Sequence, residues 1–152
     1  MKAMDGEHGE NDQTEARLLR AAQAAMAMSY SPYSHYPVGA ALLLADGRIV
    51  SGANIENAAY PVSLCAERAA VAVALAAGQR EFAAIAVASR GTPPAPPCGA
   101  CRQVLSEFNP VLPVLVTGES GPAVARYTLD ELLPWSFGPQ HLEREHAASG
   151  PA

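Results

Sequence analysis

The sequence is poor in charged residues, and above all in basic ones. Charged residues make up 16% of the 152 positions, and 10 Lys and Arg stand against 15 Asp and Glu, for a net charge of −5. Proteins that bind nucleic acid usually present a basic face to the phosphates. The missing basic excess argues against a nucleic-acid partner. The acidic charge does not exclude a small neutral substrate, since long-range electrostatic steering matters little for such a molecule.

Long apolar runs are also missing. The segment 1–7 lacks the apolar stretch of a signal peptide. The apolar run 69–77 is bounded by Arg68 and Gly78 and is too short to cross a bilayer. We therefore expect no membrane partner and a cytoplasmic location.

Cysteine is scarce, with three in the whole chain, namely Cys65, Cys98 and Cys101. An odd number with C-x-x-C spacing does not fit a secreted disulfide framework and favours a reducing compartment. The pattern is C-A-E at 65–67, followed about thirty residues later by P-C-G-A-C at 97–101. This layout is typical of zinc-dependent nucleobase deaminases. Three protein ligands also leave the fourth position of a tetrahedral zinc open to water.

Other interpretations of these cysteines account for less of the pattern. A lone C-x-x-C can be a structural zinc half-site or a redox pair. Structural zinc normally has four protein ligands, but the four histidines fall in expected tails or loops without ligand-like spacing. Redox chemistry would leave Cys65 and Glu67 without a role. The H-x-E at 8–10 lies in an expected tail and is assigned to chance.

Glu67 is the residue that we expect to be catalytic. Zinc lowers the pKa of bound water from about 15.7 to near 7, and a carboxylate beside the metal can move that water's proton to a ring nitrogen. Both cysteine motifs are expected at helix N-termini, where thiolates are favoured. Arg68 is a candidate donor to the sulfurs, offsetting the charge of three thiolates. The alternative for Glu67 is a solvated glutamate on a helix surface.

The hydrophobic pattern predicts a single α/β domain. Helices are expected at 15–29 with Thr14 as N-cap, 65–77, 98–108, and from 128 or 129 to 133. Strands are expected at 38–44, 48–53, 82–89, 112–117 and 123–127, the first two joined by a turn at Asp46-Gly47. This alternation predicts a three-layer α/β/α sandwich with a mixed central sheet of about five strands. We expect one zinc-dependent domain at 14–139, a disordered tail at 1–13 and a mobile tail at 140–152.

Several segments together resemble the small cytidine deaminases of nucleoside salvage, in their homotetrameric, three-cysteine form. They are Y-S-P-Y-S-H-Y-P-V-G-A-A-L at 30–42, N-I-E-N-A-A-Y at 54–60, C-A-E-R at 65–68, P-C-G-A-C-R-Q-V at 97–104 and E-L-L-P-x-x-F at 131–137. The resemblance covers about residues 15–140. It implies hydrolysis of cytidine and 2'-deoxycytidine to uridine and 2'-deoxyuridine plus ammonia, in pyrimidine salvage. Zinc-bound hydroxide would attack C4, and Glu67 would shuttle protons.

The resemblance also implies a set of site residues. One Zn²⁺ per subunit would be held by Cys65, Cys98 and Cys101, with Arg68 bonded to ligand thiolates. The sugar hydroxyls would meet Asn54 and Glu56, and backbone groups near Ala66 would read the base. From the residues alone, the favoured interpretation of Asn54 and Glu56 is that they are loop-forming polar residues.

Aromatic residues complete the implied site. The pyrimidine would lie between Tyr36 and Phe137 of a neighbouring subunit, with Tyr60 at the sugar across a subunit boundary. The active sites of the implied homotetramer are then shared. The family often has phenylalanine where Tyr36 stands, so this chain carries an extra hydroxyl there. Without the resemblance, Phe137 is a core or interface anchor.

Three other functions compete with cytidine deamination. A deaminase of another cytosine compound, of the blasticidin S type, would keep the cysteine motifs but lack N-I-E-N-A at 54–58. A polynucleotide deaminase fits poorly with an acidic chain. A catalytically silent, zinc-stabilised interaction domain would not require Glu67.

Overall fold

The protein is built around one five-stranded sheet. The computed structural model describes the backbone of residues 5–142 and the side chains of residues 11–142. The strands stand in the order β2-β1-β3-β4-β5, with β3 and β4 parallel and the other neighbours antiparallel. Their bounds are β1 Val38–Leu44, β2 Ile49–Ala53, β3 Phe82–Ser89, β4 Pro113–Thr117 and β5 Ala125–Thr128. The expected mixed sheet is confirmed.

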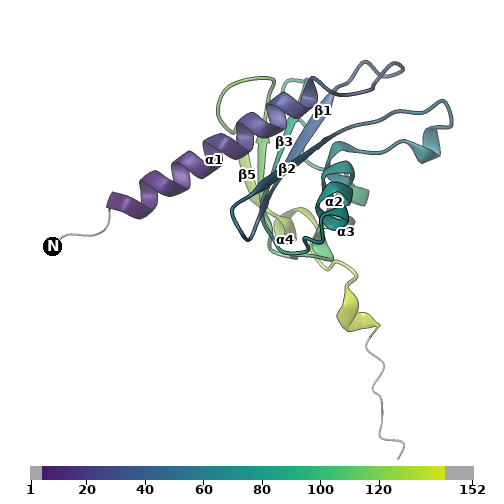
Figure 1. The fold of residues 1–152 in the computed structure, drawn as a ribbon. Coiled ribbons are helices and arrows are strands. Elements are labelled where there is room, and N and C mark those ends of the chain that lie inside the picture. Colours follow the sequence, from purple (N-terminus) through teal and green to yellow (C-terminus); the bar gives the residue numbers. More distant parts are fainter. Residues whose placement is uncertain (1–4, 143–152) are drawn as a thin grey trace, which may run out of the picture.

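Helices cover both faces of the sheet (Figure 1), which confirms the three-layer α/β/α class. On one face lies α1 (Asp5–Met26), and on the other lie α2 (Ala66–Ala76) and α3 (Gly99–Ser106). The short α4 (Leu129–Leu132) follows β5. Since α2 and α3 share one face, their first turns can contribute to one site.

Alternation along β3 separates the two hydrophobic cores. Ala86 and Ala88 pack in the core under α1, whereas Ile85 and Val87 pack in the core under α2 and α3. Successive side chains of a strand point to opposite faces, so an apolar run such as β3 serves both layers. Ser89 continues the alternation on the side of Val87, and both residues line a cavity on the face that α2 and α3 cover.

Two glycines let the helices approach the sheet closely. A Cβ added at Gly39 would lie 2.1 Å from the backbone oxygen of Ala22 in α1. A Cβ at Gly52 would lie 2.5 Å from the backbone nitrogen of Ala70 in α2. These distances are far below van der Waals contact, so each position requires glycine. Contact at this range also explains why the packed helix faces are rich in alanine.

The hairpin and helix ends follow from local chemistry. Gly47 has a positive φ of 83°, and the backbone N–H of Arg48 donates to Asp46 at 3.0 Å, so the Asp46-Gly47 turn is confirmed. Gly78, with φ of 76°, follows α2. Thr128 and Glu131 form a reciprocal cap on α4.

The expected start of the first helix is wrong. We expected the helix to begin at Glu15, but α1 begins at Asp5 and ends at Met26 instead of Ser29. The segment 5–14 contains no proline, and its Glu and Gln residues favour a helix, so the helix extends through Gly6 and Gly9 despite their low helix propensity. Part of the segment expected to be a tail is thus helical, while residues 1–4 lie outside the described part.

Near the other end, a short 3₁₀ turn spans Pro139–His141. It reaches into the segment expected to be a mobile tail, of which residues 143–152 lie outside the description. Between residues 5 and 142, no helix has the length and apolarity needed to cross a membrane.

Candidate metal centre and active site

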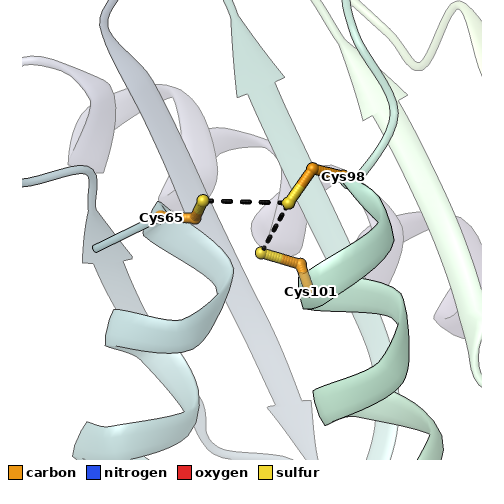
Figure 2. A group of neighbouring side chains, drawn as sticks. All are labelled: Cys65, Cys98 and Cys101. Carbon is orange, nitrogen blue, oxygen red and sulfur yellow. Dashed lines mark hydrogen bonds between the residues drawn. The ribbon is translucent and has the colours of Figure 1, made fainter. Parts of the chain in front are cut away.

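The three cysteines come from the first turns of two neighbouring helices. Cys65 is the N-cap residue of α2, Cys98 is the N-cap residue of α3, and Cys101 lies within the first turn of α3. Neither N-cap sulfur makes a capping bond to the backbone of its helix, so the sulfurs are available. Figure 2 shows the three side chains pointing toward one another from the two helices. The fold therefore brings together residues more than thirty positions apart.

The sulfur geometry fits one tetrahedral zinc ion. The Sγ atoms of Cys65 and Cys98 are 3.9 Å apart, those of Cys98 and Cys101 are 3.5 Å apart, and all three lie within 4.8 Å. Zinc–sulfur bonds of about 2.3 Å at tetrahedral angles place sulfurs about 3.8 Å apart. None of the three cysteines forms a disulfide. Within the described side chains, no other cluster of three His, Cys, Asp or Glu residues could share an ion.

The surroundings favour a thiolate at Cys65. A hydrogen bond from Cys101, helped by Arg68, lowers the pKa of Cys65 to about 5. The same pairing, together with burial, raises the pKa of Cys101. The Arg68 guanidinium donates from Nη2 to Cys65 Sγ at 3.6 Å and to the backbone oxygen of Ser63 at 3.3 Å. Its Nε is buried without a hydrogen-bond partner. Arg68 therefore lies where it can neutralise ligand thiolates.

Glu67 lies in the first turn of α2 and is buried, with 4% of its surface exposed. Burial raises the pKa of its carboxyl group, and the negative charge at Cys65 adds to the shift. Its carboxylate does not belong to the sulfur group. The alternative of a solvated glutamate on the helix surface is therefore excluded, and Glu67 is a buried acid beside, but outside, the sulfur group.

One cavity of about 280 Å³ joins these groups to most of the expected substrate contacts. Cys65, Cys98 and Glu67 line it, while Cys101 is fully buried. The expected contacts that also line it are Tyr36, Asn54, Glu56 and Ala66. Its volume is near the lower end of the range for small-molecule pockets.

The side chains of Asn54 and Glu56 hold the loop between α1 and β1. Asn54 donates from Nδ2 to the backbone oxygen of Tyr36 at 2.9 Å, and its Oδ1 accepts from the Val38 N–H at 2.9 Å. Glu56 accepts from the backbone N–H groups of Tyr33 and Ser34 at 2.9 and 3.1 Å. The loop-forming interpretation of both residues therefore holds, and both still line the cavity.

A family model describes the same region. Residues 12–117 match the cytidine and deoxycytidylate deaminase zinc-binding region. The chain belongs to this deaminase family. Curated relatives include a cytidine deaminase of Halalkalibacterium halodurans, 45% identical over 79% of this chain and 91% of the relative. Another, from Sporosarcina psychrophila, is 45% identical over 83% of this chain and 93% of the relative.

Solved structures agree with the deaminase assignment. A crystal structure of cytidine deaminase from Burkholderia pseudomallei matches with a TM-score of 0.76 and 46% identity, over 80% of this chain and 98% of that one. A blasticidin-S deaminase of Bacillus cereus is more distant, at 30% identity over 82% of this chain and 93% of the relative. The zinc-binding character predicted from the cysteines is supported by both the family match and the sulfur geometry.

Two of the expected deaminase contacts lie outside this cavity. Tyr60 is 69% exposed and makes an edge-on contact with Tyr33, with ring centroids 5.9 Å apart. Phe137 is 57% exposed and stacks on His141 at 5.2 Å. A single chain therefore does not bring Tyr60 or Phe137 to its own cysteine cavity. Both remain predictions about a contact between subunits.

Sequence reasoning did not single out several polar cavity residues of this deaminase. Ser89 is buried, lines the cavity, and its Oγ accepts from the Ala95 N–H at 2.9 Å. Ser63 also lines the cavity and accepts from the Asn57 N–H at 3.1 Å. Serine gives no distinctive sequence signal. Only the alternation of β3 could have placed Ser89 on the face of the site.

Proposed function

We propose that this protein is a zinc-dependent cytidine deaminase. It hydrolyses cytidine and 2'-deoxycytidine to uridine and 2'-deoxyuridine with release of ammonia, as in pyrimidine salvage. The observation that carries the proposal is the placement of a buried, non-ligating Glu67 beside three converging sulfurs at one cavity. The curated relatives named cytidine deaminases, at 45% identity over most of their length, support it.

In this proposal, the cysteines bind the metal and Glu67 transfers the protons. Cys65, Cys98 and Cys101 would hold zinc, which when bound supplies Lewis-acid activation of water at neutral pH. Glu67 takes a proton from the attacking water and delivers it to ring N3 of the base. The water oxygen bonds to C4, and Glu67 then takes the second proton from that oxygen and passes it to the C4 amino group. The C–N bond breaks, ammonia leaves and a carbonyl group remains at C4. The raised pKa of Glu67 suits a group that must hold and release that proton.

The substrate contacts combine one chain with its neighbour. Tyr36 of one subunit stacks on one face of the pyrimidine, and the partner subunit's Phe137 stacks on the other face. Each aromatic pair contributes roughly 0.5–1.5 kcal/mol beyond area burial. Backbone groups at Ala66 read the base. Glu56 and Asn54 contact the sugar hydroxyls, and the partner subunit contributes Tyr60. The proposed assembly is a homotetramer with shared sites and one zinc per subunit, and the exposure of Tyr60 and Phe137 leaves both side chains accessible to a partner subunit.

A cytoplasmic location accords with this activity. Free cysteine thiols at a metal site are best preserved in a reducing compartment.

The deciding experiment follows the loss of cytidine absorbance on incubation with the purified protein. We expect turnover by the wild type, loss of turnover when a chelator removes zinc, and a fall of several orders of magnitude for Glu67→Gln. Zinc content measured on the variant should equal that of the wild type, because Glu67 is not a ligand. A zinc-loaded wild type without turnover would point to the silent interaction domain, and full activity in the variant would remove Glu67 from the mechanism.

A further inference from the structure

Ser34 connects two cavity residues through one hydroxyl group. It lies in the exposed loop that joins α1 to β1. Its Oγ accepts a hydrogen bond from the backbone N–H of Tyr36 at 3.0 Å. The same hydroxyl donates to Oε1 of Glu56. Tyr36 and Glu56 both line the cavity beside Cys65, so Ser34 bonds to both while lining a neighbouring hollow itself.

The direction of these bonds is fixed by the chemistry of the groups. A backbone N–H can only donate, and an ionised carboxylate can only accept. The Ser34 proton must therefore point at Glu56, and a lone pair must point at Tyr36. The bond from Ser34 is also the leading cause that lowers the pKa of Glu56, so this carboxyl group stays ionised.

Glu56 retains room for a substrate hydroxyl. Its Oε2 accepts the backbone N–H groups of Tyr33 and Ser34, and its Oε1 accepts the Ser34 hydroxyl. Two carboxylate oxygens offer about four acceptor sites in all. Three donors hold the carboxylate in place, and one acceptor site is left for the cavity.

Tyr36 is held on both sides of its backbone. Its N–H donates to Ser34, and its carbonyl oxygen accepts from Asn54 Nδ2 at 2.9 Å. The preceding residue, His35, adopts a left-handed conformation with φ of 54°, which turns the chain sharply between Ser34 and Tyr36. The direction of the Tyr36 ring therefore depends on the bonds that close this turn.

We propose that Ser34 is a positioning residue that couples the ring stacked on the base to the carboxylate that contacts the sugar. This inference rests on the proposed function. Ser34 acts on substrate only through Tyr36 and Glu56. Because both contacts are made in the ground state and in the transition state, loss of the hydroxyl weakens binding and leaves the chemical step nearly unchanged.

The test is steady-state kinetics of zinc-loaded Ser34→Ala with cytidine. We expect KM to rise about tenfold and kcat to stay within about threefold of the wild type, as for loss of one hydrogen bond to a charged group. Ser34→Thr keeps the hydroxyl and should restore KM. Ser106→Ala is the matched control, since that hydroxyl bonds to the Gln103 backbone oxygen on α3, away from the cavity lining.

A double-variant cycle separates positioning from a general loosening of the fold. If Ser34 acts largely through Glu56, then Ser34→Ala adds little to KM in a Glu56→Gln background. Full additivity of the two changes, a wild-type KM in Ser34→Ala, or failure of Ser34→Thr to restore KM would each overturn the inference. Such results leave the proposed function standing, whereas a zinc-loaded wild type without turnover removes both.

Discussion

Glu67 and Glu56 are two carboxylates in opposite environments around one cavity. Burial raises the pKa of Glu67, whereas hydrogen bonds led by that of Ser34 lower the pKa of Glu56. A group with a raised pKa can exchange protons near neutral pH, and one with a lowered pKa remains a fixed acceptor. Their surroundings thus support the proposed roles of Glu67 in proton transfer and of Glu56 in substrate recognition.

Arg68 provides a prediction for a single residue. Removing its guanidinium by Arg68→Gln takes away the donor to Cys65 Sγ. Because groups that bond to metal ligands typically tune affinity 10- to 100-fold, we expect zinc affinity to fall by about that factor. Competition with a chromogenic chelator measures it.

The matched control for this prediction is Arg90→Gln. Arg90 forms an exposed ion pair with Glu119 at 2.6 Å and has no contact with the cysteines. Equal zinc affinity in the Arg68 variant and the wild type would show that Arg68 does not support the thiolates.

At the scale of elements, the position of α2 decides the geometry of the site. This helix carries Cys65 at its N-cap and Glu67 in its first turn, and it presses on the sheet at Gly52. A small shift of α2 would move Cys65 relative to Cys98 on α3. The close contact between α2 and the sheet therefore sets the spacing of the sulfur atoms as well as the packing of the core.

Gly52→Ala tests this dependence. The added Cβ would lie 2.5 Å from the Ala70 nitrogen and 2.9 Å from the Ala66 oxygen, both backbone atoms of α2. We expect a loss of about 1–3 kcal/mol in the free energy of unfolding, as for other overpacked cores, together with weaker zinc binding. Urea unfolding and metal titration measure the two effects.

Gly118→Ala is the control for this change, because its nearest neighbour would be the Pro94 side chain at 3.9 Å. A stable Gly52→Ala protein with wild-type zinc affinity would contradict the close contact.

Elements with strong local signals were predictable, and contacts between distant segments were not. The apolar runs at 38–44 and 82–89 match β1 and β3 residue for residue, since a strand covered on both faces appears in the sequence as a continuous apolar run of strand length. The start of α1 was wrong because polar residues continue a helix without marking its end. The metal ligands were predicted by spacing, but the bond between Ser34 and Glu56 joins residues 22 positions apart and has no local signature.

At the scale of the whole molecule, the proposed sharing of active sites between subunits leads to a distinctive prediction. At cytidine concentrations well below KM, Glu67→Gln subunits should be nearly inactive when alone, and Phe137→Ala subunits should lose most of their activity because the stacking and the burial of the ring are both lost. If Phe137 completes the site of a neighbour, mixed oligomers regain sites that pair an intact Glu67 with an intact Phe137. Random mixing in equal amounts places about a quarter of the sites in that state, by the logic of shared symmetric interfaces.

The measurement is cytidine turnover after the two variants are unfolded together, refolded with zinc and compared with each variant treated alone. We expect about a quarter of wild-type activity in the mixture. No recovery in mixed oligomers of confirmed size would place Phe137 outside the neighbour's site.

The start of α1 lies far from α2 and α3 (Figure 1), while Phe137 precedes the short turn Pro139–His141 at the other end of the described chain. A fluorophore or purification tag attached ahead of α1 would thus be remote from the cysteine cavity. One attached behind His141 would sit close to Phe137, where bulk could hinder assembly. Immobilisation on a sensor surface should accordingly use the amino-terminal side.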